Sequence, residues 1–256
     1  MALLTDFGAA DPYVGAMKGA ILSVCPEATL VDITHEVSPH DVLAGALALA
    51  AACPTFPEGT VFVAVVDPGV GSSRRGLALL AGLHLFVGPD NGLFSFVLRE
   101  HAESRVHGLE NERLFRSPVS PVFHGRDVFG PVAGHLARGV PLVEVGPRVG
   151  DPVLLEAPEP RQIAPGEWEA AVLHVDRFGN LTTAVPGQVV LGARAVEVRV
   201  GAASIPWVRT YADVDPGSLC ALVGSSGRLE VAVREGSASA RLGVGKGSPV
   251  RVRVVW

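Results

Sequence analysis

Short apolar runs alternate with helical patterns over the first 90 residues of the chain. The apolar runs cover residues 2–4, 28–33, 60–66 and 76–88. They are rich in aliphatic and β-branched side chains, as buried strands are. Amphipathic or apolar segments of helical length separate the first three runs. An order of strand, helix, strand, helix, strand predicts an α/β domain with a parallel sheet.

Two of the expected helices begin with the same pair of residue types. "DPYVGAMKGAILSVC" has Asp11 in position to cap a helix that starts at Pro12. "SPHDVLAGALALAAAC" offers Ser38 and Pro39 for the same purpose. Proline is favoured in the first helical turn because its missing N–H group costs nothing there. The sequence therefore predicts helices that start at these two places.

A third helix is expected from Asp127 to Arg138, with Asp127 as its N-cap and Gly139 at its end.

The sequence pattern changes after the Pro- and Glu-rich stretch 154–169. From residue 170 onward the runs are short and strand-like, and Gly, Pro, Ser and Asp separate them. This pattern predicts a small all-β domain, either a barrel or a sandwich. We expect an α/β domain over residues 1–160 and a β domain over residues 161–256.

Composition narrows the class of partner. The chain has 256 residues, 48% of them hydrophobic, which is enough for a full core. Its net charge is -5 and no basic block occurs, so nucleic acid and anionic membranes are not expected partners. The longest apolar run, residues 42–53, is too short to span a bilayer. A small molecule or another protein is the expected partner.

The cysteines and the N-terminal segment point to one compartment. Cys25, Cys53 and Cys220 are odd in number and far apart, so neither a disulfide framework nor a zinc site is predicted. The opening "MALLTDFG" has no basic region ahead of an apolar run, which is not the pattern of a secretory signal. Both observations favour a cytoplasmic protein.

Acidic residues follow the expected strands. Asp6, Asp67 and Asp90 each come just after an apolar run. In open α/β sheets ligands bind outside the carboxyl ends of the strands, so these three side chains are candidates for one site. Asp is also common in turns, and "DPG" and "PDNG" are strong turn sequences, which leaves a purely structural interpretation open.

A second polar cluster is "FHGRDVFGPVAGHLARG", where His124 precedes the third expected helix. Free N–H groups at a helix start favour anions or polar ligands.

Several familiar binding and catalytic motifs are absent from the sequence. "GVGSSR" lacks the third glycine of a dinucleotide loop, and no phosphate loop or nucleophile elbow occurs. His35 and His40 cannot share a helix face for zinc, because Pro39 lies between them.

Seven ordered motifs resemble one family over nearly the whole chain. They are "LLTDFG…DPYVGAMKG", "ITHEVSPHDVLAGA", "VVDPGVGSSRR", "VGPDNGLFS", "FHGRDVFGPVAGHLA", "HVDRFGNLTT" and "GSSGRLEVAV". The chain is similar to the S-adenosyl-L-methionine (SAM) hydroxide adenosyltransferases, which are related to fluorinase and chlorinase. The resemblance implies an N-terminal Rossmann-like α/β domain and a C-terminal β-barrel. It also implies a homotrimer with active sites between the N-terminal domain of one subunit and the C-terminal domain of its neighbour.

The resemblance implies hydrolysis of SAM to adenosine and methionine by attack of water on the ribose 5′-carbon. It assigns the water to Asp67, Arg74 and His124, and the ribose hydroxyls to Asp6. Asp176 and Ser225 match the positions that hold the methionine end of SAM. The matches on the adenine side are Asn180, which reads the base, Tyr211, which stacks on it, and, as weaker matches, Glu230 and the backbone at Val233.

Three other functions stay open from the sequence. The chain could be a non-catalytic module that binds SAM or adenosine, or a SAM-dependent halogenase. A carboxylate at position 67 would repel a halide, which disfavours the second alternative. A metal-dependent hydrolase has only the number of Asp and His residues in its favour. We expect no metal and no cofactor, with SAM as the substrate.

Overall fold

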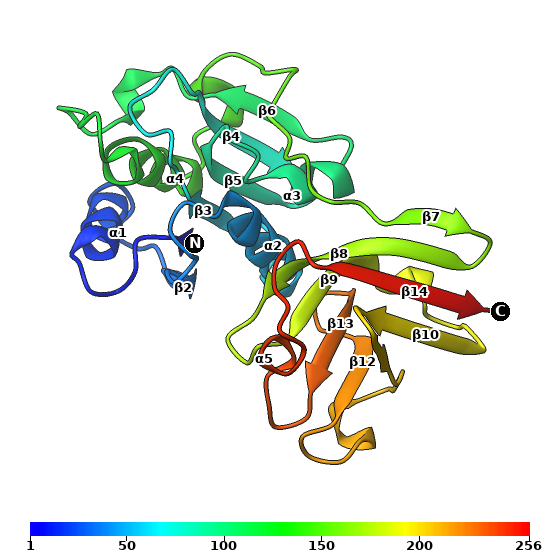
Figure 1. The fold of residues 1–256 in the computed structure, drawn as a ribbon. Coiled ribbons are helices and arrows are strands. Elements are labelled where there is room, and N and C mark those ends of the chain that lie inside the picture. The colour runs from blue at the N-terminus through cyan, green and yellow to red at the C-terminus, as the bar shows by residue number, and fades with distance from the viewer. The chain divides into compact units, whose positions relative to one another are not determined.

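The computed structural model describes all 256 residues and divides into two compact units, Met1–Leu155 and Glu156–Trp256 (Figure 1). Unit 1 is an α/β unit and unit 2 is built of antiparallel strands. The domain boundary after residue 160 stays a prediction from the sequence. None of the helices is long and apolar enough to cross a membrane.

The sheet of unit 1 has six strands in the order β2-β1-β3-β5-β4-β6. Neighbours among β2, β1, β3 and β5 are parallel, whereas β4 is antiparallel to both β5 and β6. The parallel arrangement predicted for the first three strands is confirmed, and only β4 runs antiparallel to its neighbours. The apolar run 76–88 is a hairpin, because Gly82 turns the chain with a φ of 55°. The strands are β1 (Ala2–Thr5), β2 (Val31–Thr34), β3 (Val61–Val65), β4 (Gly76–Ala81), β5 (His84–Pro89) and β6 (Arg105–Gly108).

Helices cover both faces of this sheet. Successive side chains of a strand point to opposite faces, so Leu3 and Val63 pack in one core and Leu4 and Ala64 in the other. The first core includes α1 (Tyr13–Val24) and α4 (Gly130–Ala137), which lie side by side in Figure 1. The second core includes α2 (Val42–Ala52) and α3 (Ser95–Glu100).

Two helix starts differ from the prediction. Helix α1 begins after Pro12, and no side chain caps it, so Asp11 is not its N-cap. Helix α2 is capped by Asp41, whose side chain accepts a hydrogen bond from the Ala44 N–H group, and not by Ser38. The reason is His40, whose φ of 67° is left-handed and cannot belong to a right-handed helix that begins at Ser38.

The third predicted helix is present, but Asp127 does not cap it. The segment begins as a π-helical turn, η3 (Gly125–Phe129), and continues as α4. Pro131 has no N–H group to bond back to residue 127, and the Asp127 carbonyl accepts instead from the Arg116 N–H group at 2.8 Å. The predicted end is confirmed, since Gly139 follows the helix with a φ of 90°.

Unit 2 confirms the prediction of a β-barrel. Its sheet runs β11-β10-β14-β8-β9-β13-β12, with β7 paired to β8. The two ends of that order meet just after β11, where Val208 N–H donates to the Ala221 carbonyl and Ala221 N–H donates to the Pro206 carbonyl. The strands are β7 (Arg161–Ala164), β8 (Glu167–Val175), β9 (Leu181–Pro186), β10 (Ala195–Val200), β11 (Ala203–Ile205), β12 (Leu219–Val223), β13 (Arg228–Val233) and β14 (Pro249–Val255).

Unit 2 also contains a short helix that the sequence pattern did not reveal. Helix α5 (Ala238–Leu242) is capped by Ser237 and ended by Gly243, whose φ is 65°. Only one or two turns long, it is too short to show a helical period. The remaining 3₁₀ turns are η1 (Cys53–Thr55), η2 (Glu112–Leu114), η4 (Leu142–Val145), η5 (Gly187–Val189) and η6 (Tyr211–Asp213).

Candidate active site

The candidate site of unit 1 lies where the order of the parallel strands reverses. The chain goes from β1 to β2 on one side of β1 and then crosses to β3 on the other side. Such a switch point leaves a crevice between the carboxyl ends of the two adjacent strands. Thr5 and Val65 are paired at these ends, so Asp6 and the loop that starts at Val66 and Asp67 leave the sheet next to each other.

Asp67, Arg74 and His124 form one connected group. Arg74 donates from Nε to Asp67 Oδ1 at 2.9 Å and from Nη2 to Asp67 Oδ2 at 2.5 Å. The same Nη2 lies 2.8 Å from Nδ1 of His124. The Asp67 and Arg74 side chains are only 5% and 11% exposed. A bidentate ion pair that is screened from water fixes both partners in one geometry.

The contact with Arg74 determines the protonation of His124. A guanidinium can only donate hydrogen bonds, so Nδ1 of His124 must be the acceptor and the ring proton must be on Nε2. Burial, together with the positive charge of Arg74, lowers the pKa of His124 below its usual range. His124 is therefore neutral at pH 7 and has one N–H group to donate.

Two contacts hold this group in place. The Arg74 guanidinium lies over the ring of Phe129 at 5.1 Å, and the His124 ring meets the same ring edge-on at 6.4 Å. The loop after Asp67 also packs tightly against the segment before His124. Gly71 has a φ of 77°, and a Cβ added there would lie 2.6 Å from the Pro121 carbonyl oxygen.

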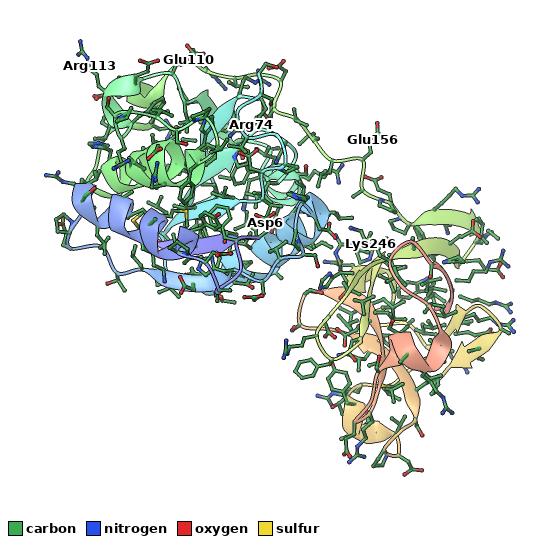
Figure 2. The ribbon with its side chains drawn as sticks, turned by 60° about the vertical axis from the view of Figure 1, so that its left-hand side comes forward. Asp6, Arg74, Glu110, Arg113, Glu156 and Lys246 are labelled. Atoms are coloured by element: carbon green, nitrogen blue, oxygen red, sulfur yellow. The ribbon has the colours of Figure 1, made fainter.

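A pocket of about 260 Å³ opens beside the group. Asp6, labelled with Arg74 in Figure 2, lies on its wall, and its Oδ2 accepts from the His40 N–H group at 2.9 Å. An aromatic wall adjoins it: the rings of Phe7, Tyr13 and Phe123 meet pairwise edge-on. The lining residues are Asp6, Phe7, Tyr13, Pro39, His40, Val65, Asp67, Val70, Val122, Phe123, His124 and Gly125.

Asp90 does not belong to this pocket, although it also follows a strand. Its carboxylate is buried and accepts from Arg75 at 2.8 Å and from the Val153 N–H group at 2.8 Å. Arg75 also bonds Asp151. The two adjacent arginines thus differ in role, since Arg74 serves the pocket and Arg75 anchors the loop. Of the two interpretations left open for Asp90, these bonds favour the purely structural one.

Four of the predicted residues of unit 2 form two bonded pairs. Asp176 accepts from the Asn180 N–H group at 2.8 Å and from its side-chain amide at 3.1 Å. Tyr211 donates to Glu230 Oε1 at 2.6 Å. Burial and the nearby charge of Asp176 raise the pKa of Glu230. Burial and the bond to Glu230 raise the pKa of Tyr211, so its hydroxyl stays protonated.

The two other predicted residues of unit 2 lie on the β12–β13 hairpin. Ser225 is exposed in the turn, beside Gly224. A Cβ added to Gly224 would lie 2.6 Å from Glu230 Oε2, so Glu230 packs directly against this turn. Val233 is buried at the end of β13 and paired with Leu219. No cluster of three or more His, Cys, Asp or Glu side chains is placed to hold a metal ion.

The aromatic wall was not among the predicted parts of the site. Phe7 directly follows Asp6, and Phe123 directly precedes His124. Adjacency to two predicted site residues was an available signal. It was not used, because an aromatic side chain in a buried segment is equally compatible with a core position.

Comparisons with known proteins agree over nearly the whole chain. The family models described as SAM hydroxide adenosyltransferase N-terminal and C-terminal domain match residues 1–146 and 170–251. A protein of Thermus thermophilus named (R)-S-adenosyl-L-methionine hydrolase is 43% identical, with 97% of each chain covered. A fluorinase of an Actinoplanes species is 30% identical over 72% of this chain and 70% of its own length. The crystal structure of an uncharacterized conserved protein from Thermotoga maritima has a TM-score of 0.92 and 37% identity, covering 98% of this chain and 99% of that one.

Proposed function

The chain belongs to the SAM hydroxide adenosyltransferase family, and on that premise we propose that it hydrolyses SAM to adenosine and L-methionine. The family resemblance seen in the sequence motifs is thereby confirmed. The observation that carries the proposal is the group of Asp67, Arg74 and His124 beside a pocket at the strand switch point. Asp67 and His124 line that pocket, and Arg74 bonds both of them.

The three side chains suit a water molecule as nucleophile. Each Asp67 oxygen accepts one bond from Arg74, which leaves lone pairs that can accept a water O–H group. Nε2–H of His124 can donate to the water oxygen. These bonds fix the water and orient a lone pair toward the substrate, and positioning of this kind supplies a large part of catalysis.

The chemical step needs no acid for the leaving group. The water oxygen forms a bond to the ribose 5′-carbon while the bond from that carbon to sulfur breaks. The electron pair goes to sulfur, so methionine leaves as a neutral thioether. The attacking water becomes strongly acidic as its C–O bond forms, and Asp67 accepts a proton from it late in the step. That proton then passes to solvent.

The pocket fits the ribose end of the substrate. Asp6 uses one oxygen for the His40 N–H group and keeps lone pairs for ribose hydroxyl groups. For the other ends of SAM we propose roles for the unit 2 residues. Asp176 pairs with the methionine ammonium together with Ser225, and Asn180 reads adenine. Tyr211 stacks on the base, with Glu230 and the Val233 backbone beside it.

We also propose that the protein is a cytoplasmic homotrimer. In it, unit 1 of one subunit and unit 2 of its neighbour share each active site. Exposed apolar side chains support an assembly: Val122 lines the pocket and is 73% exposed, and Phe178, between Asp176 and Asn180, is 76% exposed. The three cysteines are free and buried, which fits a reducing compartment.

The assembly is tested by mixing two inactive variants, Asp67→Asn and Asn180→Ala, under conditions that exchange subunits. Shared sites predict recovered activity, because some mixed sites receive an intact residue from each subunit. Sedimentation of the unmixed protein should give a trimer. Full activity in a monomer would contradict the assembly.

The hydrolysis is tested by chromatography of SAM incubated with the purified protein under four conditions: no addition, halide, chelator, and both. We expect adenosine and methionine in all four conditions. Asp67→Asn should reduce the rate at least about 100-fold, as the loss of base-like assistance does. Asp151→Asn, at an 85% exposed carboxylate that also pairs with an arginine, is the control and should keep the rate. Tight adenosine binding without turnover would indicate a binding module, and a 5′-halogenated product would indicate a halogenase.

A further inference from the structure

Asp127 is a fully buried carboxylate that the proposed chemistry does not use. It is 0% exposed and accepts hydrogen bonds from three different groups. Arg126 donates from Nε and Nη2, both at 2.7 Å, and Arg116 donates from Nη1 at 3.1 Å. The Ser120 N–H group donates to Oδ2 at 2.9 Å. These partners hold the pKa of Asp127 below its usual range against the effect of burial, so the group is charged.

These bonds close a loop whose far part forms the pocket wall. The Asp127 carbonyl accepts from the Arg116 N–H group, and its carboxylate accepts from the Ser120 N–H group. The chain between these anchors carries Phe123 and His124, both of which line the pocket. Asp127 thus fastens the loop at two points and does not itself line the pocket.

The Asp127 carboxylate also bonds Arg126, and Arg126 contacts the aromatic wall. The Arg126 guanidinium lies 4.9 Å from the centre of the Phe123 ring, over its face. Its two bonds to Asp127 fix the plane of that guanidinium. Phe123 in turn packs against Phe7 and Tyr13. One buried charge therefore sets the position of both Phe123 and His124.

Stability alone does not explain a charge at this place. A buried ion pair is seldom more stabilising than well-packed apolar residues of the same volume. The π-helical turn that contains Asp127 points the same way, because such turns occur often at functional sites. Both observations favour a role in geometry.

We propose that Asp127 is a positioning residue that holds His124 and Phe123 in their places on the pocket wall. This inference rests on the proposed function of His124 in holding the water. Without the Asp127 carboxylate the loop loses its bonds to the Ser120 N–H group and to the Arg116 guanidinium. His124 then moves away from Arg74, and the water loses a fixed donor.

The first test is a double-mutant cycle for the rate of SAM hydrolysis. Asp127→Asn should lower kcat at least about 10-fold, since small displacements at a reacting centre are costly. In the His124→Ala background the same change should alter the rate less than about 2-fold, because His124, the positioned residue that bonds the attacking water, is gone. An equal loss in both backgrounds would overturn the proposal.

Asp90→Asn is the matched control, because Asp90 is also buried and also pairs with an arginine and a backbone N–H group. Its effect on the rate should be the same with and without His124. Coupling between Asp90 and His124 as large as that of Asp127 would show a general effect of lost stability and would overturn the proposal.

The second test does not depend on turnover. Nitrogen-15 NMR of the histidine rings should show a single Nε2–H tautomer for His124 in the unchanged protein. Asp127→Asn should give a mixture of tautomers as the contact with Arg74 is lost. Arg116→Gln removes one donor from a half-exposed side chain and should shift the tautomer balance in the same direction by less, which covers the case that Asp127→Asn does not fold.

The two tests separate the proposals. If the protein releases no adenosine but the tautomer balance changes, the proposed function is wrong and the positioning role stands. If the protein hydrolyses SAM but the tautomer balance is unchanged in both variants, the positioning role is wrong.

Discussion

Arg74 and His124 are 50 residues apart in the chain, yet Nη2 of Arg74 lies 2.8 Å from Nδ1 of His124. The same nitrogen also bonds Asp67, so a single guanidinium connects a carboxylate on the β3–β4 loop with an imidazole at the start of a π-helical turn. This contact fixes the tautomer of His124 and leaves its other nitrogen able to donate. The arrangement makes Arg74 the centre of the site.

Replacing Arg74 with lysine tests that role. A lysine keeps the charge, but it cannot make two parallel bonds to Asp67 and a third to His124. We expect Arg74→Lys to lower kcat at least about 100-fold, in line with the loss of oriented polar groups. Single-turnover release of adenosine is the measurement. A rate within a factor of two of the unchanged protein would show that charge alone suffices.

The pH dependence of the rate follows from His124. Its pKa is lowered in the folded protein, so it is neutral at pH 7 and protonates only below its usual value of about 6.5. Protonation places an N–H group of His124 against an N–H group of Arg74 and breaks the contact. We expect kcat to fall on the acid side, below pH 6.5.

The acid limb has a matched control and a consequence for stability. His124→Gln should remove the limb. His135→Gln, at another histidine with a lowered pKa but outside the pocket, should keep it. As pH falls, His124 takes up a proton at a higher pH in the unfolded chain than in the folded protein. The free energy of unfolding therefore decreases as pH falls from about 6.5 through the pKa of His124 in the folded protein. A rate that is flat from pH 7 to pH 5 would contradict this assignment.

Gly71 tests the packing of the two loops that form the site. Gly71→Ala adds a Cβ 2.6 Å from the Pro121 carbonyl at a φ of 77°. Gly59→Ala has a φ of 78° but open space around the new Cβ, so it isolates the backbone cost, roughly 1 kcal/mol. Urea unfolding should show a larger loss for Gly71→Ala, and kcat should fall for that variant only. Equal losses of stability would show that the loops move apart freely.

We expect the buried charge of Glu230 to lower the stability of unit 2 at neutral pH. Its pKa is raised in the folded protein, so the folded state binds more protons than the unfolded state between the two pKa values, and stability falls as pH rises through that range. Glu230→Gln keeps an acceptor for Tyr211 and removes the buried charge. We expect Tm to rise about 2 to 4 °C at pH 7, equivalent to roughly 1 kcal/mol, and the gain to shrink toward pH 4. A lower Tm at pH 7 would show that the charged form is the stabilised one.

Much of the site could be predicted from the ends of the strands. Asp6 and Asp67 follow buried apolar runs, and parallel pairing of β1 with β3 brings their ends together. Asp90 has the same sequence context, but Arg75 and the Val153 N–H group take up its carboxylate. These partners are 15 and 63 residues away, so no local pattern could distinguish Asp90 from the other two.

The support around the site could not be predicted locally. Asp127 looked like a helix N-cap, because Asp is one of the residues favoured at that position. Its partners are the adjacent Arg126 together with Arg116 and Ser120, and the last two lie in an irregular segment with no periodicity. His40 likewise shifts the start of α2, because it adopts a left-handed backbone conformation. Glycine favours this conformation, so a histidine gives no sign of it in the sequence. The barrel of unit 2 was predictable because alternating strands and turns recur over its whole length.

The most direct test of the central claim is hydrolysis of SAM in water enriched in oxygen-18, followed by mass spectrometry of the adenosine. Attack of water on the ribose 5′-carbon predicts one solvent-derived oxygen per adenosine, on the 5′-hydroxyl group, so the labelled fraction of adenosine should equal the enrichment of the water. Absence of adenosine, or adenosine without the label, would contradict the account.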